Sequence, residues 1–249
     1  MRRETQNVLL ILLGGALVKI AVNGDFLRYV KPAQQPWIVA GGAVMVVLGV
    51  VAIVHDVLAA RSKVTVDAVP EEHDHAHDDG HAHSARPAWL LLVPVLAVFL
   101  VAPPALGADS VIRTEARVPS SAAAASAAAF PPLPMGNVIP LPVNEFVSRA
   151  GWDTAGTLNG RTVSLTGFVV HTDGGTLLAR LVISCCAADA FPVTVRLRGG
   201  EADHLASDAW IQVTGQVVPG TATKDNSYTP DFTPASVTPV PTPKDPYEY

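Results

Sequence analysis

Cysteine is nearly absent from this chain of 249 residues, and its two cysteines, Cys185 and Cys186, are neighbours. Two adjacent cysteines cannot supply the disulfide framework of a small secreted protein. Charge is also scarce, because Lys, Arg, Asp and Glu make up 16% of the residues, below the share of about 25% in soluble domains.

The chain has no basic surplus. Acidic residues outnumber Lys and Arg by 22 to 17. Residues 71–83 hold five of the acids and no base, so the remainder balances at 17 against 17. Proteins that bind nucleic acid need a basic surface. We therefore expect no nucleic-acid partner.

Catalytic motifs are missing too. The sequence has no nucleophile elbow, no phosphate-binding loop, no H-E-x-x-H zinc motif and no paired-carboxylate site. Asp173 lies in the sequence Asp-Gly-Gly, where a hairpin turn accounts for it. The sequence therefore predicts a protein that is not an enzyme.

What is present is a set of three apolar runs. The run at 88–108 has no charge over 21 residues, which at about 1.5 Å per residue just crosses a hydrocarbon core of about 30 Å. A buried core helix is the alternative. Its prolines at 94, 103 and 104 would weaken a helix in water, whereas membrane helices tolerate proline better, so we expect a membrane span.

Two earlier runs, at about 7–22 and 37–58, predict two further spans. The first has the basic flank of a signal peptide, but Lys19 interrupts it and no clean A-x-A cleavage site follows. We therefore expect a retained span, with Lys19 reaching toward the interface. Glycines in both runs indicate close helix packing, either as ordinary membrane-helix usage or as a face for a partner.

Three spans place the two ends of the chain on opposite sides of the lipid bilayer. With the N-terminus inside, five basic residues flank the cytoplasmic ends of the spans and four flank the outer ends. This weak bias predicts the orientation of a multi-pass protein of the plasma membrane. The loop 71–83 is then cytoplasmic and the C-terminal domain extracytoplasmic.

The sequence divides into a membrane domain (1–108), a Pro/Ala-rich linker (109–142) and a folded domain (143–249). A short helix near Asn144–Arg149, with Asn144 as its N-cap, is expected to open the last part. From residue 160 the apolar pattern has period two, which predicts an all-β domain. Its core residues are expected to be Val163, Leu165, Leu181, Val195, Ile211 and Val213.

Five strands are expected, beginning in RTVSLTGFVV and followed by 177–184, 193–198, 210–218 and an edge strand at 237–240. Gly167 interrupts the alternation as a β-bulge would, and a short helix is expected at 201–207. Five short strands with glycine-bearing bends favour an OB-like barrel. The fold class is thus a three-span helical membrane part followed by an OB-like five-stranded barrel.

Histidines in the loop 71–83 are the first candidate metal ligands, because imidazole and carboxylate bind zinc, nickel or copper. The alternative is a solvated acidic spacer, since the spacing defines no preformed cage. No cofactor is fixed by the sequence, and zinc or another divalent ion is the candidate for these residues: His73, His75, His77, His81 and His83.

The second candidate site is Cys185-Cys186 in ISCCAADAFP. If the preceding strand continues, the two side chains point to opposite faces, and a vicinal disulfide would need a strained ring. If the strand breaks, the pair could gather with His171, His204 or Asp189 around a soft metal. The alternative is one small core cysteine beside one half-exposed thiol.

These features resemble a known family. Two spans, a histidine-bearing loop and a third span precede GFVVH, LVISCCAADAFPV, WIQVTGQV and PYEY. The chain resembles the YcgQ-type family of uncharacterised bacterial membrane proteins, described as permease subunits. The resemblance implies an OB-like C-terminal domain and a larger multi-spanning permease as partner, but neither substrate nor active site. The tract 219–245 is looser than the family pattern.

We therefore expect an accessory subunit of a membrane permease, with a metal ion as the candidate substrate and Cys185, Cys186 and Asp189 as the candidate functional residues. The first alternative is a stand-alone membrane protein that binds metal or senses redox state. The second is a membrane-tethered OB module for nucleic acid or glycan, which the lack of a basic surface disfavours.

Overall fold

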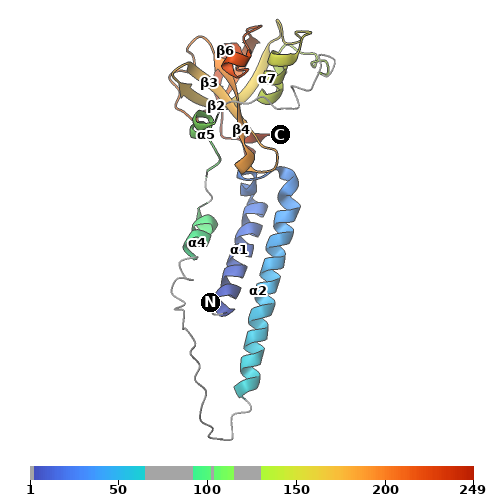
Figure 1. The fold of residues 1–249 in the computed structure, drawn as a ribbon, viewed down its shortest axis with the longest axis vertical. Helices are drawn as coiled ribbons and strands as arrows, with labels where there is room; N and C mark the ends of the chain where they lie inside the picture. The colour runs from blue at the N-terminus through green and yellow to red at the C-terminus, as the bar shows by residue number, and fades with distance from the viewer. Residues whose placement is uncertain (1–2, 65–91, 102–103, 115–129) are drawn as a thin grey trace. The chain divides into compact units, whose positions relative to one another are not determined.

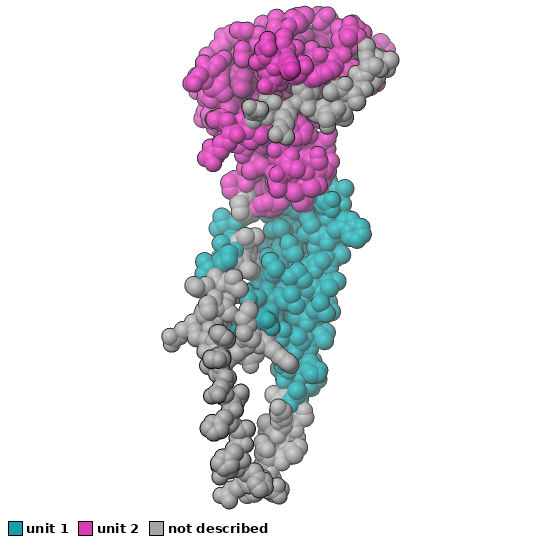
Figure 2. All heavy atoms as spheres, in the orientation of Figure 1, with its two compact units in different colours: residues 1–26, 32–103 teal, residues 27–31, 104–249 magenta. Residues whose placement is uncertain are grey.

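The computed structural model describes residues 3–64, 92–101, 104–114 and 130–249. The chain forms two compact units, shown in different colours in Figure 2. Unit 1 is drawn from residues 1–26 and 32–103, and unit 2 from residues 27–31 and 104–249. The short segment 27–31, which joins the first two helices, thus belongs to the second unit.

Unit 1 is helical. Its helices are α1 (Arg3–Asn23), α2 (Gln35–Val64), the short 3-10 helix η2 (Pro32–Gln34) and α4 (Leu92–Leu100), and the 3-10 helix η1 (Asp25–Arg28) follows α1 at the unit boundary. Two stretches, Thr5–Asn23 and Pro32–Ala59, are long and apolar enough to cross a membrane. They include the first two predicted spans, and most large apolar side chains of the second stretch are exposed. The predicted helical N-terminal part is confirmed at this level.

The third predicted span is described only in part. Helix α4 has nine residues, and residues 88–91 and 102–103 lie outside the described part of the chain. The last residues of the predicted span belong to unit 2, since Ala108 opens the short helix α5 (Ala108–Arg113). There the Asp208 carboxylate accepts the Ala108 N–H at 2.6 Å, which holds the first turn of α5.

Helices α1 and α2 pack side by side (Figure 1). The contact is close because it is made at glycine. A Cβ built on Gly14 would lie 2.7 Å from the Gly42 carbonyl oxygen, and one built on Gly42 would lie 2.9 Å from the Gly14 oxygen. By contrast, a Cβ on Gly15 or Gly41 would meet nothing within 4 Å. Only some of the glycines therefore form the α1–α2 contact, and Gly15 and Gly41 are not among them.

Unit 2 is a mixed β-sheet with short helices. Its strands are β1 (Ile139–Pro140), β2 (Val163–Thr172), β3 (Gly175–Val182), β4 (Phe191–Leu197), β5 (Trp210–Val217), β6 (Asp231–Pro239) and β7 (Tyr247–Glu248). The five longer strands pair in a ring, β2–β5–β6–β4–β3–β2. All pairs in the ring are antiparallel except β4–β6, which is parallel. The two-residue strands β1 and β7 add parallel pairs to β2 and β3.

The last long strand differs from the sequence prediction. An edge strand was expected at 237–240, but β6 begins at Asp231 and pairs with both β5 and β4. The Thr/Pro-rich composition hid this strand, because its side chains alternate little in polarity. The bulge also lies elsewhere: the register shifts at Thr214/Gly215 rather than at Gly167, where a Cβ would meet the Ala179 carbonyl oxygen at 2.5 Å.

Helix α7 (Val143–Trp152) precedes β2 and packs against the sheet. Its N-cap is Pro142 rather than the expected Asn144. The first turn is instead capped from a distance, since the Glu248 carboxylate accepts the N–H groups of Val143 at 2.8 Å and Asn144 at 2.7 Å. The helix expected at 201–207 is a series of turns.

Two apolar clusters fill unit 2. The larger includes Phe146 of α7 and Phe232 of β6, whose rings meet edge to face at 5.6 Å. The smaller packs α5 against Phe168, Leu181 and Tyr247. All six core residues predicted from the sequence are at most 2% exposed. Strict alternation on half-buried strands made them predictable.

Candidate functional site

The candidate site is the loop between β3 and β4, residues 183–190. Strand β3 ends at Val182, and a 3-10 helix, η4 (Ala187–Asp189), precedes β4. Because the strand has ended, the two neighbouring cysteines do not point to opposite faces. Their Sγ atoms lie 3.6 Å apart. Cys185 is exposed and Cys186 half-buried, and both are free thiols.

Asp189 folds back onto the cysteines. Its Oδ1 accepts the Ser184 N–H at 2.8 Å, and its Oδ2 accepts the Cys185 N–H at 2.7 Å. One carboxylate oxygen and the two sulfurs all lie within 4.8 Å of one another. The sequence left His171, His204 and Asp189 open as partners of the cysteine pair, and the structure places Asp189 beside it.

The charge balance of the loop follows from this geometry. Desolvation acts to raise the pKa of Asp189, but hydrogen bonds from the Cys185 thiol and three backbone N–H groups outweigh it, so the pKa is lowered. The hydrogen bond to Asp189, followed by the contact with Cys186, raises the pKa of Cys185 to about 11. At neutral pH the loop therefore pairs a carboxylate with a protonated thiol.

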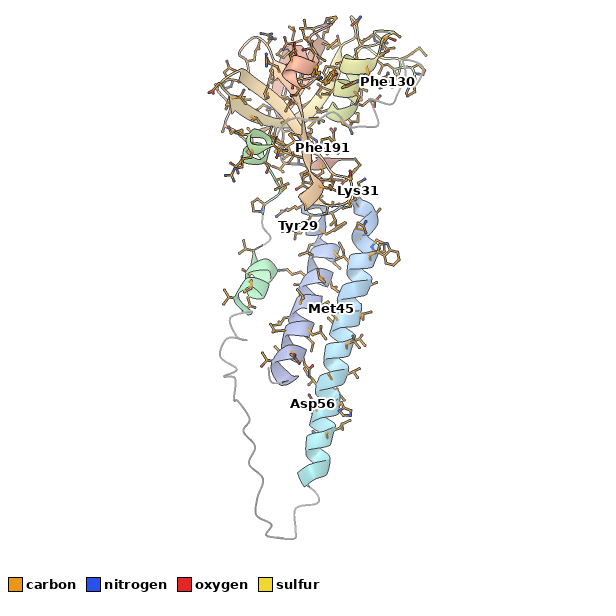
Figure 3. The ribbon with its side chains drawn as sticks, viewed as in Figure 1. Tyr29, Lys31, Met45, Asp56, Phe130 and Phe191 are labelled. Carbon is orange, nitrogen blue, oxygen red and sulfur yellow. The ribbon has the colours of Figure 1, made fainter. Side chains whose placement is uncertain are left out.

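A segment from the start of the chain holds the loop. The Ala187 N–H donates to the Tyr29 carbonyl oxygen at 2.7 Å, and the Lys31 N–H donates to the Cys185 oxygen at 3.5 Å. Val30 and Cys186 form an isolated antiparallel bridge between these bonds. Figure 3 labels Tyr29 and Lys31 of this segment, and Phe191, the first residue of β4.

Sequence reasoning missed this contact. Residues 27–31 have no pattern of their own, and they lie more than 150 positions before the loop. Nothing local in the sequence indicates the pairing.

The C-terminal residues complete the surroundings. Tyr247 pairs with Leu181, and its hydroxyl donates to the Arg28 carbonyl oxygen at 2.9 Å. The Glu248 carbonyl oxygen accepts the Ile183 N–H at 3.0 Å, immediately after β3. The segments around Arg28, the cysteine loop and the C-terminal strand therefore meet within unit 2. The sequence PYEY is part of the family resemblance, but the resemblance does not predict these contacts.

The two histidines of unit 2 lie outside the cluster. The His171 Nε2 is 2.7 Å from the Leu205 carbonyl oxygen, and its Nδ1 is 3.2 Å from the Thr176 Oγ1. Both ring nitrogens thus have partners within the fold. His204 is exposed, and neither histidine belongs to the metal-ligand group found among the described residues.

The histidines of the loop 71–83 lie outside the described residues. Their predicted metal binding stays a prediction. Among the described residues, Cys185, Cys186 and Asp189 are the group of metal-type ligands that the fold brings together. Two soft sulfurs and one carboxylate form a donor set suited to zinc and related ions.

Comparisons with known proteins follow the same division of the chain. The DUF1980 N-terminal domain matches residues 5–115, and the DUF1980 C-terminal domain matches residues 153–249. No curated protein and no solved structure matches. The two matches take in α1 and α2 at one end and the cysteine loop at the other, and the chain belongs to the DUF1980 family.

Proposed function

We propose that this chain is the accessory subunit of a larger permease in the bacterial plasma membrane, with a metal ion as the candidate substrate. The YcgQ-type resemblance, which is narrower than the DUF1980 family, supports a permease partner. The proposal includes three spans, with a third through 88–108, and an extracytoplasmic C-terminal domain. In this arrangement the cysteine loop meets the substrate, or the partner, on the outer side.

The helix pair carries the proposal. Residues 8–18 of α1 and 38–54 of α2 include no ionisable side chain. A pathway for ions normally shows ionisable groups within the membrane. The contact of Gly14 with Gly42 leaves no room for a Cβ, let alone a hydrated ion, between the two helices. An ion pathway therefore needs a second, larger protein.

The form of unit 2 supports an OB-type barrel within this proposal. Five strands close a ring through one parallel pair, β4–β6, which fits a small Greek-key barrel of the OB type. One departure is that turns, rather than a helix, connect β4 to β5 in the described chain. A barrel of this kind offers a rigid frame on which the cysteine loop is held in place.

Site-specific crosslinking tests for the partner. A benzophenone amino acid in place of Val47, whose side chain is 59% exposed on α2, should capture a multi-spanning protein in native membranes. The matched control is Val46, which packs against Gly14 and should crosslink only within the chain. If the Val47 probe captures lipid alone, the accessory role is wrong.

Transport is the second test. The purified chain in liposomes should not move Zn²⁺, whereas cells should lose transport when Cys185 and Cys186 are both replaced by serine. Membrane insertion of that variant should be unchanged, because the substitutions lie in an exposed loop of unit 2. Zn²⁺ movement through the purified chain alone would make it the carrier itself.

A stand-alone metal-binding or redox-sensing role is the second candidate. The two free thiols favour it, because their sulfurs lie 3.6 Å apart and Cys185 is exposed, so a soluble metal ion or oxidant can reach the pair. In that case the two thiols should oxidise and reduce reversibly in the isolated protein, and no permease should be captured. The crosslinking experiment separates the two functions.

A further inference from the structure

We propose that Cys185, Cys186 and Asp189 form a three-ligand exchange site for a tetrahedral, thiophilic divalent ion of the Zn²⁺ class. This inference rests on the proposed metal-handling function and names the class of ion. Binding would release the two thiol protons to solvent, so that two thiolates and one carboxylate surround the ion. The fourth coordination position stays open to water or to a ligand that receives the ion.

The distance between the sulfurs selects the geometry. With Zn–S bonds of about 2.3 Å, sulfurs 3.6 Å apart subtend an S–Zn–S angle of about 100°, close to tetrahedral. An ion in linear two-coordination with bonds of that length would need sulfurs about 4.6 Å apart. The spacing of the two sulfurs therefore suits a tetrahedral ion of the Zn²⁺ class, whereas a linear Cu⁺ or Ag⁺ centre would have to spread them.

The carboxylate is already oriented for the third position. Each oxygen of Asp189 accepts one backbone N–H, from Ser184 or Cys185. A carboxylate has about four lone-pair sites, so it can accept both bonds and still bind an ion. These hydrogen bonds hold the carboxylate in one orientation, as hydrogen bonds from outer-shell groups do for ligands in known metal sites. The site needs little ordering when the ion arrives.

The backbone of the loop is anchored while its thiols remain accessible. Tyr29 and Lys31 hold it on one side through hydrogen bonds to Ala187 and Cys185, and Glu248 holds Ile183 at its start. Cys185 and Asp189 are nevertheless exposed. Structural zinc sites are closed by four protein ligands, and sites that exchange a ligand have three. Three ligands on an anchored loop, two of them exposed, are therefore suited to transfer of the ion rather than storage.

Titration of the full chain in detergent micelles with Cd²⁺ tests the site. Cadmium bound by thiolate gives an ultraviolet charge-transfer band that histidine and carboxylate ligands do not give. We expect one Cd²⁺ per chain with this band, displaced by Zn²⁺. The band should be absent in the variant with serine at positions 185 and 186.

Two matched variants test the third ligand. After correction for proton competition at Cys185, measured by thiol titration of each variant, Asp189→Asn should weaken Cd²⁺ binding at least about tenfold, as loss of a positioning or ligating group does in metal sites. Asp173→Asn removes an acid from an exposed turn of the same unit and should change nothing. Replacing the five histidines of 71–83 by alanine should leave the band intact. A band that does not depend on Asp189 would overturn the three-ligand site.

The outcomes also separate this site from the proposed function. If wild-type protein gives no charge-transfer band, the metal site is wrong, although capture of a permease would leave the accessory role standing. If the band appears but Val47 captures no protein, the metal site stands and the accessory role fails.

Discussion

Asp189 accepts hydrogen bonds both from the backbone of its own loop and from the thiol of Cys185. The carboxylate accepts a hydrogen bond from that thiol, which raises the pKa of Cys185 and disfavours the reactive thiolate at neutral pH. Asp189 thus controls the reactivity of Cys185 through the pKa of its thiol.

Asp189→Asn should make Cys185 more reactive in metal-free protein. Without the carboxylate, the pKa falls from about 11 toward its ordinary range, so the thiolate fraction at pH 8 rises. The lower basicity of the thiolate offsets part of this gain, leaving an increase of several-fold, up to about tenfold. Iodoacetamide alkylation measured against pH checks the shift, with Asp173→Asn as control. An unchanged rate profile would show that Asp189 does not control the thiol.

At Gly215, strands β5 and β6 approach too closely to leave space for a side chain. A Cβ there would lie 2.1 Å from the Thr233 carbonyl oxygen, so Gly215→Ala should cost about 1–3 kcal/mol of the free energy of unfolding. Gly174→Ala is the control, because its Cβ would make only ordinary contacts of 3.7 Å or more. Thermal unfolding of both variants, followed by circular dichroism, measures the difference. Equal melting temperatures would contradict the close approach of β5 to β6.

At the scale of elements, β7 is short but connects several parts of unit 2. Its residue Glu248 caps α7 and forms an ion pair with Arg180 of β3, with Nε and Oε1 3.4 Å apart. Each side chain of the pair is only 11% exposed. Arg180 also lies 4.8 Å from the ring centroid of Trp210 on β5. Two residues of β7 thus fix a helix and a strand.

Glu248→Gln should destabilise unit 2 by about 3 kcal/mol, because it leaves the buried Arg180 guanidinium without its counter-charge. The double variant Arg180→Met/Glu248→Gln should recover part of this loss, since no unpaired charge then remains. Melting temperatures of the two variants and the wild type give the answer. If both variants lose the same stability, the ion pair is not what connects β7 to the sheet.

Sequence reasoning succeeded where a pattern is local and failed where partners are distant. Period-two alternation located four of the five long strands and the predicted core, and Asp-Gly-Gly marked the hairpin between β2 and β3. Strand β6 escaped because Thr and Pro blur the alternation of its faces. Asn144 looks like a cap by composition, but its helix is capped by Glu248, 104 residues away. The geometry of the cysteine pair depends on where β3 ends, and the sequence next to Val182 contains no Gly or Pro that would mark the end of the strand.

At the scale of the whole molecule, the proposed three-span arrangement predicts the sides on which two segments lie. In intact cells, a membrane-impermeant maleimide should label a single cysteine introduced by Asp173→Cys, in the exposed turn between β2 and β3 of a variant with serine at 185 and 186. A single cysteine at position 76, in a variant with serine at 185 and 186, should react only after permeabilisation. Labelling of both on the same side would mean an even number of spans between them.

The dependence of unit 2 on its last residues also determines when it can fold. Strand β7 and the cap that Glu248 provides are synthesised after every other strand of the sheet, and α1 and α2 are synthesised long before them. During translation the apolar helices therefore emerge while the sheet still lacks a strand and α7 lacks its cap. In the proposed membrane arrangement, delivery of the nascent chain to the membrane can thus precede completion of the domain, and a ribosome stalled before Tyr247 would leave the cysteine loop without the Ile183–Glu248 hydrogen bond at its start.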